Sequence, residues 1–380
     1  MSGNAKMSKQ MRILHTADVH LDRQYSGLGM NASIAAARRQ ELRDAFRRFI
    51  DLALELRVDA VTIGGDLYEH ERSTLDTGNF LAQQFARLGQ TPALIAPGNH
   101  DPIVPASLYR RVAWPPNVAI FGEPRFRAFR LANGVTVWGA GHDGPDLRQN
   151  LLEGFRVRAE GTHVLLFHGS DLHAVPEGKR AHCGFRPEDI ERTGAQFALL
   201  GHYHNACLYP AEAPRFAYPG SLETLDFSEA GQHFVLRLDV GSGATRAELL
   251  PFGRVRYVTH TLDVAGMTTS EELRSGIAAC VDREAIVRVV LEGLLEPDIE
   301  LDVPALYNAC AESFRFLDIV DRTEPAYSLE SLALESTTKG AFVRLMQSRL
   351  ASLAGSERET AELALRFGLQ AFERREVIVP

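Results

Sequence analysis

The chain has 380 residues and a formal net charge of −8, and its four cysteines show no CxxC spacing. That length predicts two or three domains with a core that needs no disulfides, and the cysteine pattern argues against a zinc-thiolate site. No apolar run approaches the roughly 20 residues that cross a bilayer, and the polar first twelve residues are not a signal peptide. We therefore expect a soluble cytoplasmic protein with no membrane partner.

The acidic charge is concentrated in the carboxyl-terminal third. Residues 251–380 hold 14 Lys+Arg against 21 Asp+Glu, whereas the rest of the chain is nearly balanced and holds twelve of the thirteen histidines. A nucleic-acid partner usually requires a basic surface, but bound divalent cations would supply positive charge where it is needed. We therefore expect the chemistry of the protein in residues 1–250.

The amino-terminal part alternates short apolar runs with amphipathic segments. Residues 38–56 and 75–88 place apolar side chains at helical spacing, and the first of these segments has a basic outer face. Each segment lies between two apolar runs of strand length. Such a β-α-β-α-β order predicts a parallel sheet covered by helices.

From residue 118 onward the pattern changes to short alternating segments. Residues 126–131 and 135–138 are joined by Asn133-Gly134, which is typical of a β-hairpin, and a second pair follows at 233–238 and 245–250. These strands predict a second sheet packed against the first.

These patterns divide the chain into three parts. Pro251-Phe252-Gly253 marks a boundary, and the alternating strand and helix patterns beyond it predict a small α/β domain. We expect a catalytic domain at 11–252, the small domain at 253–335 and carboxyl-terminal helices at 336–380. The apolar faces of those last helices fit either packing on the protein's own body or docking of a partner.

Five apolar runs each end in side chains that bind metal ions. Short apolar runs bounded by polar or glycine residues are typical of buried strands, and α/β sheets bind ligands at the carboxyl ends of their strands. The side chains that follow the runs should therefore meet at one edge. They are Asp18 and His20, Asp66, Asn99 with His100 and Asp101, His168, and His202 with His204.

These residue types favour a dinuclear metal centre. Asp18 and His20 are two residues apart and can bind the same ion, whereas His202 and His204 can serve one ion or two. Asp66 follows Gly64-Gly65, which lets the backbone approach closely, and its carboxylate can bridge two cations. Carboxylate, amide and imidazole donors suit manganese, iron or zinc, and we expect two divalent ions, with Mn²⁺ as the first choice.

A pair of such metals indicates hydrolysis of a phosphoester. Two metals about 3.5–4 Å apart stabilise an in-line displacement at phosphorus and generate a metal-bound hydroxide as the attacking group. His100 need not be a ligand and could protonate the leaving oxygen or stabilise its charge. Asp101 could orient His100 or brace its loop.

The motifs together resemble the signature of the calcineurin-like metallophosphoesterases over about residues 11–205. The resemblance implies an α/β fold of two packed mixed β-sheets flanked by helices. It also implies His100 as the catalytic histidine and a specific division of ligands. One metal would be held by Asp18, His20, Asp66 and His204, and the other by Asp66, Asn99, His168 and His202.

Within that superfamily, residues 15–22, 65–68 and 218–223 are similar to the SbcD-type DNA repair exonucleases, especially their YhaO-like branch. This similarity implies DNA as the substrate, a DNA-capping role for the small domain, and docking of an SbcC-type, SMC-like coiled-coil ATPase on the last helices. We further expect a homodimer. Several such nucleases have a histidine three residues after the bridging aspartate, where this chain has Glu69 followed by His70.

Two other functions remain open from the sequence. The chain could be a phosphoesterase for small nucleotides or phosphoproteins, or a non-catalytic subunit that senses DNA ends within an SMC-like ATPase complex. The complete ligand set and His100 favour an enzyme. No GxxxxGK[ST] motif occurs, so any ATP dependence would come from another subunit.

Overall fold

The computed structural model describes residues 10–25, 28–175, 180–229, 231–241, 245–296, 299 and 301–372. The chain divides into two compact units. The first takes in the described residues up to Thr259 together with Asp282–Arg288 and Phe314–Asp318, and the second takes in the rest. The domain boundaries expected at residues 252 and 335 stay predictions, and the last residues of the expected terminal segment lie outside the described residues.

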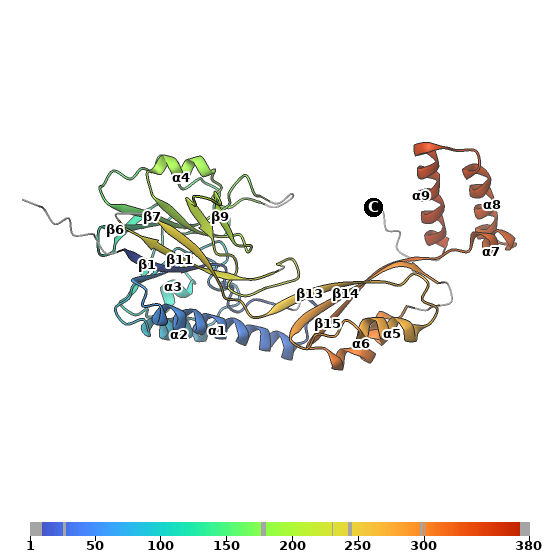
Figure 1. The fold of residues 1–380 in the computed structure, drawn as a ribbon, viewed down its shortest axis with the longest axis horizontal. Coiled ribbons are helices and arrows are strands. Elements are labelled where there is room, and N and C mark those ends of the chain that lie inside the picture. The colour runs from blue at the N-terminus through green and yellow to red at the C-terminus, as the bar shows by residue number, and fades with distance from the viewer. Residues whose placement is uncertain are drawn as a thin grey trace, which may run out of the picture. The chain divides into compact units, whose positions relative to one another are not determined.

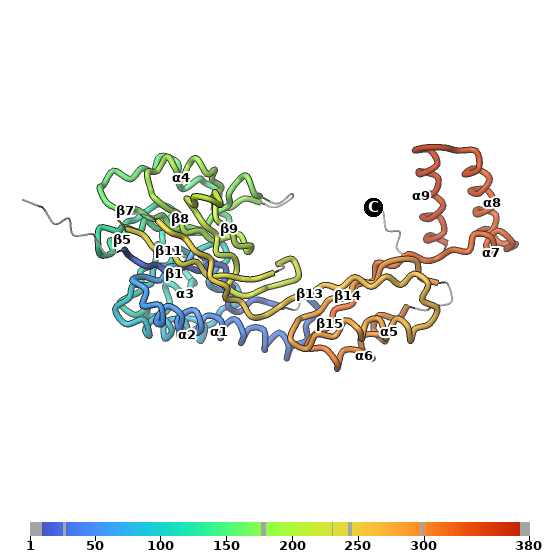
Figure 2. Tube along the Cα trace, viewed as in Figure 1, coloured from blue at the N-terminus to red at the C-terminus, as the bar shows by residue number. Residues whose placement is uncertain are grey.

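Two mixed six-stranded sheets form the body of the first unit, which confirms the predicted fold class. The hairpin predicted at 233–250 does form, but its assignment to the second sheet is wrong, because its first strand pairs with the amino-terminal strand of the first sheet. In the first sheet the strand order is β12-β11-β1-β2-β3-β4, with β1 to β4 parallel and β11 antiparallel to both β1 and β12. Figure 2 shows β1 running beside β11, although the two are far apart in the sequence. The strands are β1 (Met11–Thr16), β2 (Ala60–Ile63), β3 (Ala93–Ile95), β4 (Val118–Ile120), β11 (Phe234–Val240) and β12 (Arg246–Pro251).

The second sheet has the order β5-β6-β7-β8-β10-β9, with β6, β7, β8 and β10 parallel and antiparallel strands at both edges. Helices α1 to α3 cover the outer face of the first sheet, and α4 covers that of the second (Figure 1). The strands are β5 (Arg127–Arg130), β6 (Val135–Gly139), β7 (Thr162–His168), β8 (Phe197–Gly201), β9 (Cys207–Tyr209) and β10 (Phe216–Tyr218).

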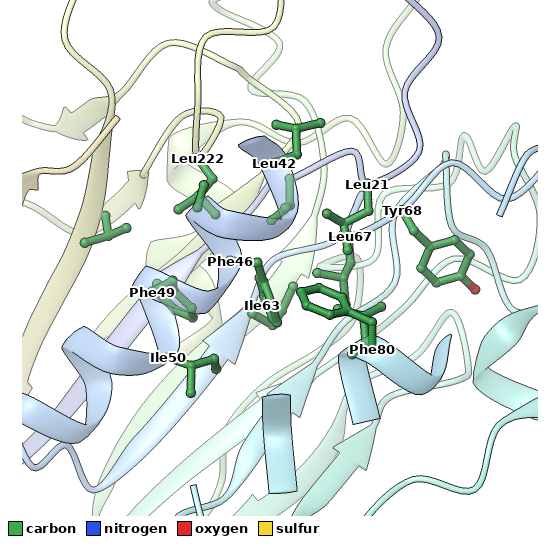
Figure 3. Close-up of a cluster of buried hydrophobic side chains, with 14 of the residues drawn as sticks. Leu21, Leu42, Phe46, Phe49, Ile50, Ile63, Leu67, Tyr68, Phe80 and Leu222 are labelled. Atoms are coloured by element: carbon green, nitrogen blue, oxygen red, sulfur yellow. The ribbon is translucent and has the colours of Figure 1, made fainter. Parts of the chain in front are cut away.

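Helices α1 (Ala32–Glu55) and α2 (Leu75–Ala86) bury the apolar faces that the sequence predicts. The short helices α3 (Leu108–Arg111) and α4 (Pro187–Thr193) are not predicted. Phe46 of α1 extends toward Ile63 of β2 and packs edge-on against Phe80 of α2 (Figure 3). A second apolar cluster lies between the sheets, where β1, β3, β6, β7, β8 and β11 all contribute side chains, and it holds the strand ends rigidly.

Helix α1 differs from its prediction in two ways. It begins at Ala32, six residues earlier than expected, because the side chain of Asn31 caps it by accepting from the Ile34 N–H. Its buried face also includes a charged residue among the apolar ones that the sequence predicts. Arg38 is 1% exposed, because the rings of Tyr25 and Tyr257 lie 5.4 and 5.6 Å from its guanidinium.

The predicted alternation of strand and helix beyond residue 253 is confirmed. It runs β13 (Arg256–Asp263), α5 (Ser270–Ala278), β14 (Ala285–Leu295), α6 (Val303–Cys310) and β15 (Phe316–Pro325), with strand order β13-β14-β15. Helices α7 (Leu329–Leu334), α8 (Thr338–Leu350) and α9 (Gly355–Phe372) follow, and buried residues of α8 and α9 form a small apolar cluster. Within the described residues, no helix combines the length and the apolar character that a bilayer crossing requires.

Candidate metal centre

The predicted ligand side chains come from the carboxyl ends of strands in both sheets, so the expectation that they meet at the edge of a single sheet is wrong. Strands β1, β2 and β3 of the first sheet precede Asp18, Asp66 and Asn99, and His168 and His202 lie at the ends of β7 and β8 of the second. Backbone hydrogen bonds join the loops after β1 and β2: the Asp18 N–H donates to the Gly65 carbonyl at 3.0 Å, and the His20 N–H to the Asp66 carbonyl at 2.9 Å. All seven side chains lie in the first compact unit.

Asp66 lies between two groups of donors. Its Oδ2 is 3.7 Å from His20 Nε2 on one side and 3.4 Å from His168 Nε2 on the other. In the first group, His204 Nε2 lies 3.8 Å from Asp18 Oδ1 and 3.3 Å from His20 Nε2. The geometry therefore matches a carboxylate shared by two neighbouring cation positions.

The second group gathers around His168. Its Nε2 lies 3.0 Å from Asn99 Oδ1 and 3.2 Å from His202 Nδ1. On the other side of the ring, Nδ1 donates to the Gly64 carbonyl at 2.8 Å, so in the neutral imidazole Nε2 carries no proton. A bare nitrogen that faces a carboxylate, an amide oxygen and a second imidazole requires a cation or a shared proton among them.

In the first group, too, each imidazole is hydrogen-bonded through Nδ1 and turns Nε2 toward the other donors. His20 Nδ1 lies 2.8 Å from Glu69 Oε1, and His204 Nδ1 lies 2.5 Å from Glu229 Oε1. Because carboxylates only accept hydrogen bonds, both Nδ1 atoms carry protons. In the neutral imidazoles the lone pairs of the two Nε2 atoms then face each other. The donor sets thus fit divalent ions of the kind that oxygen and imidazole ligands bind.

Burial and neighbouring charges set the ionisation of the candidate ligands. Burial lowers the pKa of His168 well below its ordinary value and lowers that of His202 to about 4. Burial opposes the charge of Asp66, but His168 and His100 outweigh it and hold its pKa below the usual range. Burial raises the pKa of Asp18 to about 7. Neutral imidazoles beside an ionised carboxylate are the forms that bind metal.

His100 lies at the open side of the site. Its side chain is 45% exposed, its backbone N–H donates to Asp66 Oδ1 at 2.9 Å, and its ring packs edge-on against His20 with centroids 4.8 Å apart. Its Nδ1 lies 2.9 Å from Glu69 Oε2. Burial opposes the charge of His100, but the Glu69 bond and Asp66 outweigh it and raise its pKa to about 9.

Asp101 is fully buried beneath the loop. Its Oδ1 accepts from the N–H groups of Asp66 and Gly98, and its Oδ2 accepts from the Leu67 N–H and the Tyr109 hydroxyl. Of the two roles expected for Asp101, these contacts fit the support of the loop backbone and not the orientation of His100. The carboxylate that contacts His100 belongs to Glu69, whose part in the site the sequence does not indicate.

The backbone at the site is unusual. Asp18, His20, Asp66 and His202 all have positive φ, at 51°, 50°, 52° and 117°. Non-glycine residues in that region cost free energy and cluster at functional sites. Gly98 has to be a glycine for a different reason, because a Cβ there would lie 2.2 Å from Asp66 Oδ1.

His15 lies behind the ligands and is not part of the donor sets. Its ring is fully buried and bridges the sheets, with Nδ1 3.0 Å from Thr62 Oγ1 of β2 and Nε2 3.0 Å from the Leu200 carbonyl of β8. Burial lowers its pKa to about 4.

Comparison with known proteins finds sequence relatives along most of the chain. The chain is 27% identical over 360 residues to the uncharacterized metallophosphoesterase YhaO of Bacillus subtilis, covering 86% of this chain and 85% of that protein. It is 25% identical over 368 residues to the DNA double-strand break repair protein Mre11 of Methanopyrus kandleri, covering 87% and 77%. The crystal structure of TT1561 of Thermus thermophilus overlaps 63% of this chain and 99% of that one, with 15% identity and a TM-score of 0.39.

A family model described as calcineurin-like phosphoesterase matches residues 11–206, which is just over half of the chain and includes every candidate ligand. Two mixed sheets, the converging donors and this match together give one conclusion: the chain belongs to the calcineurin-like phosphoesterase family and is a metal-dependent phosphoesterase.

Proposed function

We propose that this protein is a dinuclear metal-dependent phosphodiesterase that cleaves DNA. Asp18, His20, Asp66 and His204 would hold one ion, and Asp66, Asn99, His168 and His202 the other. The observation that supports this division is the position of Asp66, whose Oδ2 lies within 3.7 Å of an imidazole nitrogen from each group. When bound, two divalent cations supply an activated water and neutralise phosphoryl charge. We expect Mn²⁺, with Fe or Zn as the alternatives.

The residues of the chain provide the remaining parts of the reaction. His100 is a partly exposed imidazole that packs against His20 of the first group, and Glu69 orients its ring through Nδ1. Its Nε2 is then the atom that would donate a proton to the leaving oxygen or stabilise its charge. Asp101 would act indirectly, by holding the backbone of Asp66 and Gly98 in place.

DNA is proposed as the substrate from the extent of the Mre11 similarity. The match to the Methanopyrus kandleri protein spans 87% of this chain, so it includes the region after residue 253 as well as the metal centre. A similarity confined to the catalytic part would leave small phosphoesters equally supported. The capping role expected for that region belongs to the same proposal.

The substrate is tested by parallel assays with Mn²⁺ on labelled linear and circular DNA, cyclic nucleotides and p-nitrophenyl phosphate. DNA cleavage supports the proposal, and robust turnover of the small substrates without DNA cleavage rejects it. A protein that binds DNA ends without cleaving any substrate would instead be the non-catalytic sensor. Repeating the assays with Fe²⁺ and Zn²⁺ identifies the metal that supports turnover.

We also propose that the last helices bind a coiled-coil ATPase of the SMC-like type. Helices α8 and α9 bury Val343 and Leu365 between them, while Leu345 of α8 is 66% exposed and Leu334 of α7 is 86% exposed. Co-purification of such an ATPase with the full chain, but not with a chain ending at Thr337, is the expected result. Retention by the truncated chain would contradict it.

The homodimer and the cytoplasmic location also stay proposals. Analytical ultracentrifugation tests the first, and a mass of twice that of the chain is the expected result. The cytoplasmic location is supported by the four cysteines, all of which are unpaired in the structure.

A further inference from the structure

Glu229 is a buried carboxylate in contact with a candidate ligand. It is 3% exposed, and its Oε1 lies 2.5 Å from His204 Nδ1. Its Oε2 accepts from the Ser221 hydroxyl at 2.7 Å and from the Leu225 N–H at 2.9 Å. Both oxygens are therefore occupied, so the carboxylate is fixed in orientation.

The segment before Glu229 supports His204 from the backbone side. The Ser221 N–H donates to the His204 carbonyl at 3.0 Å. Gly220 has φ +80°, and a Cβ there would lie 2.6 Å from that same carbonyl oxygen. Residues 220–229 thus hold both the main chain and the ring of His204, which gives a physical role to Gly220 and Ser221.

We propose that Glu229 is the positioning residue of His204. It would fix the His204 proton on Nδ1 and direct Nε2 toward Asp18 and His20, from which it is 3.8 and 3.3 Å distant. The inference rests on the proposed metal assignment and deepens it. It concerns one cation position only, because no residue of the other group contacts Glu229: His168 donates to a neutral carbonyl instead.

A glutamine cannot replace this carboxylate. The side chain has to accept from three donors, namely the His204 ring, the Ser221 hydroxyl and the Leu225 N–H. A glutamine has one accepting oxygen, and its NH₂ group would face at least one of these donors. Glu229→Gln therefore changes the orientation of His204 while keeping the size of the side chain.

The chain offers a matched control in Glu223. It is 1% exposed and lies six residues earlier in the same segment, but its carboxylate accepts from Arg48 and from the N–H groups of Arg254 and Val255. Glu223→Gln removes a buried charge of the same kind without touching a candidate ligand.

The test is Mn²⁺ binding, measured by equilibrium dialysis and by EPR of free Mn²⁺. The parent should bind two ions. Glu229→Gln should bind one ion normally and the other 10- to 100-fold more weakly, as His204→Ala should, whereas Glu223→Gln should bind both with parental affinity. Thermal unfolding in EDTA reports on the stability of each variant independently of the metal.

Three outcomes would overturn the inference: parental affinity of Glu229→Gln for both ions, equal weakening of both ions, or the same loss in Glu223→Gln. If Glu229→Gln does not fold, Ser221→Ala replaces it, because it removes one of the three donors and leaves the carboxylate in contact with His204. A smaller loss at the same single position is then expected, and no loss contradicts the inference. Failure of the parent to bind two ions would instead reject the proposed function.

Discussion

His20 and His100 share the carboxylate of Glu69, which lies 2.8 Å from His20 Nδ1 through Oε1 and 2.9 Å from His100 Nδ1 through Oε2. One side chain thus orients both a candidate ligand and the proposed proton donor. Burial opposes the charge of Glu69, but these two histidines outweigh it and hold its pKa below the usual range. The chain therefore uses one anion to hold two imidazoles of the site.

Replacing His100 with alanine should lower the hydrolysis rate while leaving both metals bound. The ring contacts His20 and lies outside both proposed donor sets, so a loss of roughly 10²- to 10⁴-fold is expected from general acid catalysis alone. Turnover and metal content of the same preparation measure the two effects. His70→Ala is the control, and a parental rate for His100→Ala would reject the assignment.

Replacing Asp66 with asparagine should weaken both cation positions. Its Oδ2 is the oxygen that faces both His20 and His168, and the amide removes the negative charge shared by the two groups. We expect Mn²⁺ affinity to fall by more than about tenfold at both positions, as shown by titration. Asp59→Asn, at the opposite end of the strands, should change neither, and full retention of two ions by Asp66→Asn contradicts the bridging position.

Replacing Gly98 with alanine should displace Asp66. The added Cβ would lie 2.2 Å from Asp66 Oδ1 and 2.8 Å from its backbone nitrogen, so the loop itself has to move. A destabilisation of about 1–3 kcal/mol is expected together with metal loss. Thermal unfolding and metal analysis would be compared with Gly144→Ala, which has open space around the new methyl group. Unchanged metal binding would show that the loop can adapt.

The metal-free protein should lose stability as the pH falls below neutrality, in part through His15. Its pKa is lowered from 6.5 to about 4 by burial, so the unfolded chain takes up a proton that the folded one excludes. Above pH 6.5 His15 is neutral in both states and does not lower the free energy of unfolding. Between pH 6.5 and pH 4 its protonation in the unfolded chain lowers the free energy of unfolding by about 3 kcal/mol.

The measurement is urea unfolding in EDTA between about pH 7.5 and pH 4, for the parent and for His15→Gln. Other buried histidines titrate in both proteins, so the difference between the two curves isolates His15. A shallower dependence on pH is expected for the variant. Identical slopes would contradict the contribution.

The strands that carry the candidate ligands are predictable because their local sequence is unambiguous. A run such as 164–167 is buried on both sides, and the polar residue that follows it, His168, ends the strand at the carboxyl edge of the sheet. The short strands β9 and β10 are not evident from the sequence, since three residues give no period and their pairing comes from tertiary contacts.

Long-range partners of the site are also beyond sequence patterns. Glu229 is 25 residues from His204, and only the path of the intervening chain brings them together. Arg38 falls on the apolar face of its helix with Leu42 and Phe46, but the sequence does not show that the rings of Tyr25 and Tyr257 lie beside its charge there. In both cases the decisive neighbour comes from a distant segment.

The left-handed backbone at Asp18, His20, Asp66 and His202 has a cost for the whole protein. Each such residue gives up about 1–2 kcal/mol relative to relaxed geometry, and the neighbouring strands and loops have to supply that free energy. The fold is therefore less stable than its core alone would allow, and evolution toward thermal robustness would work against the very positions that make it an enzyme.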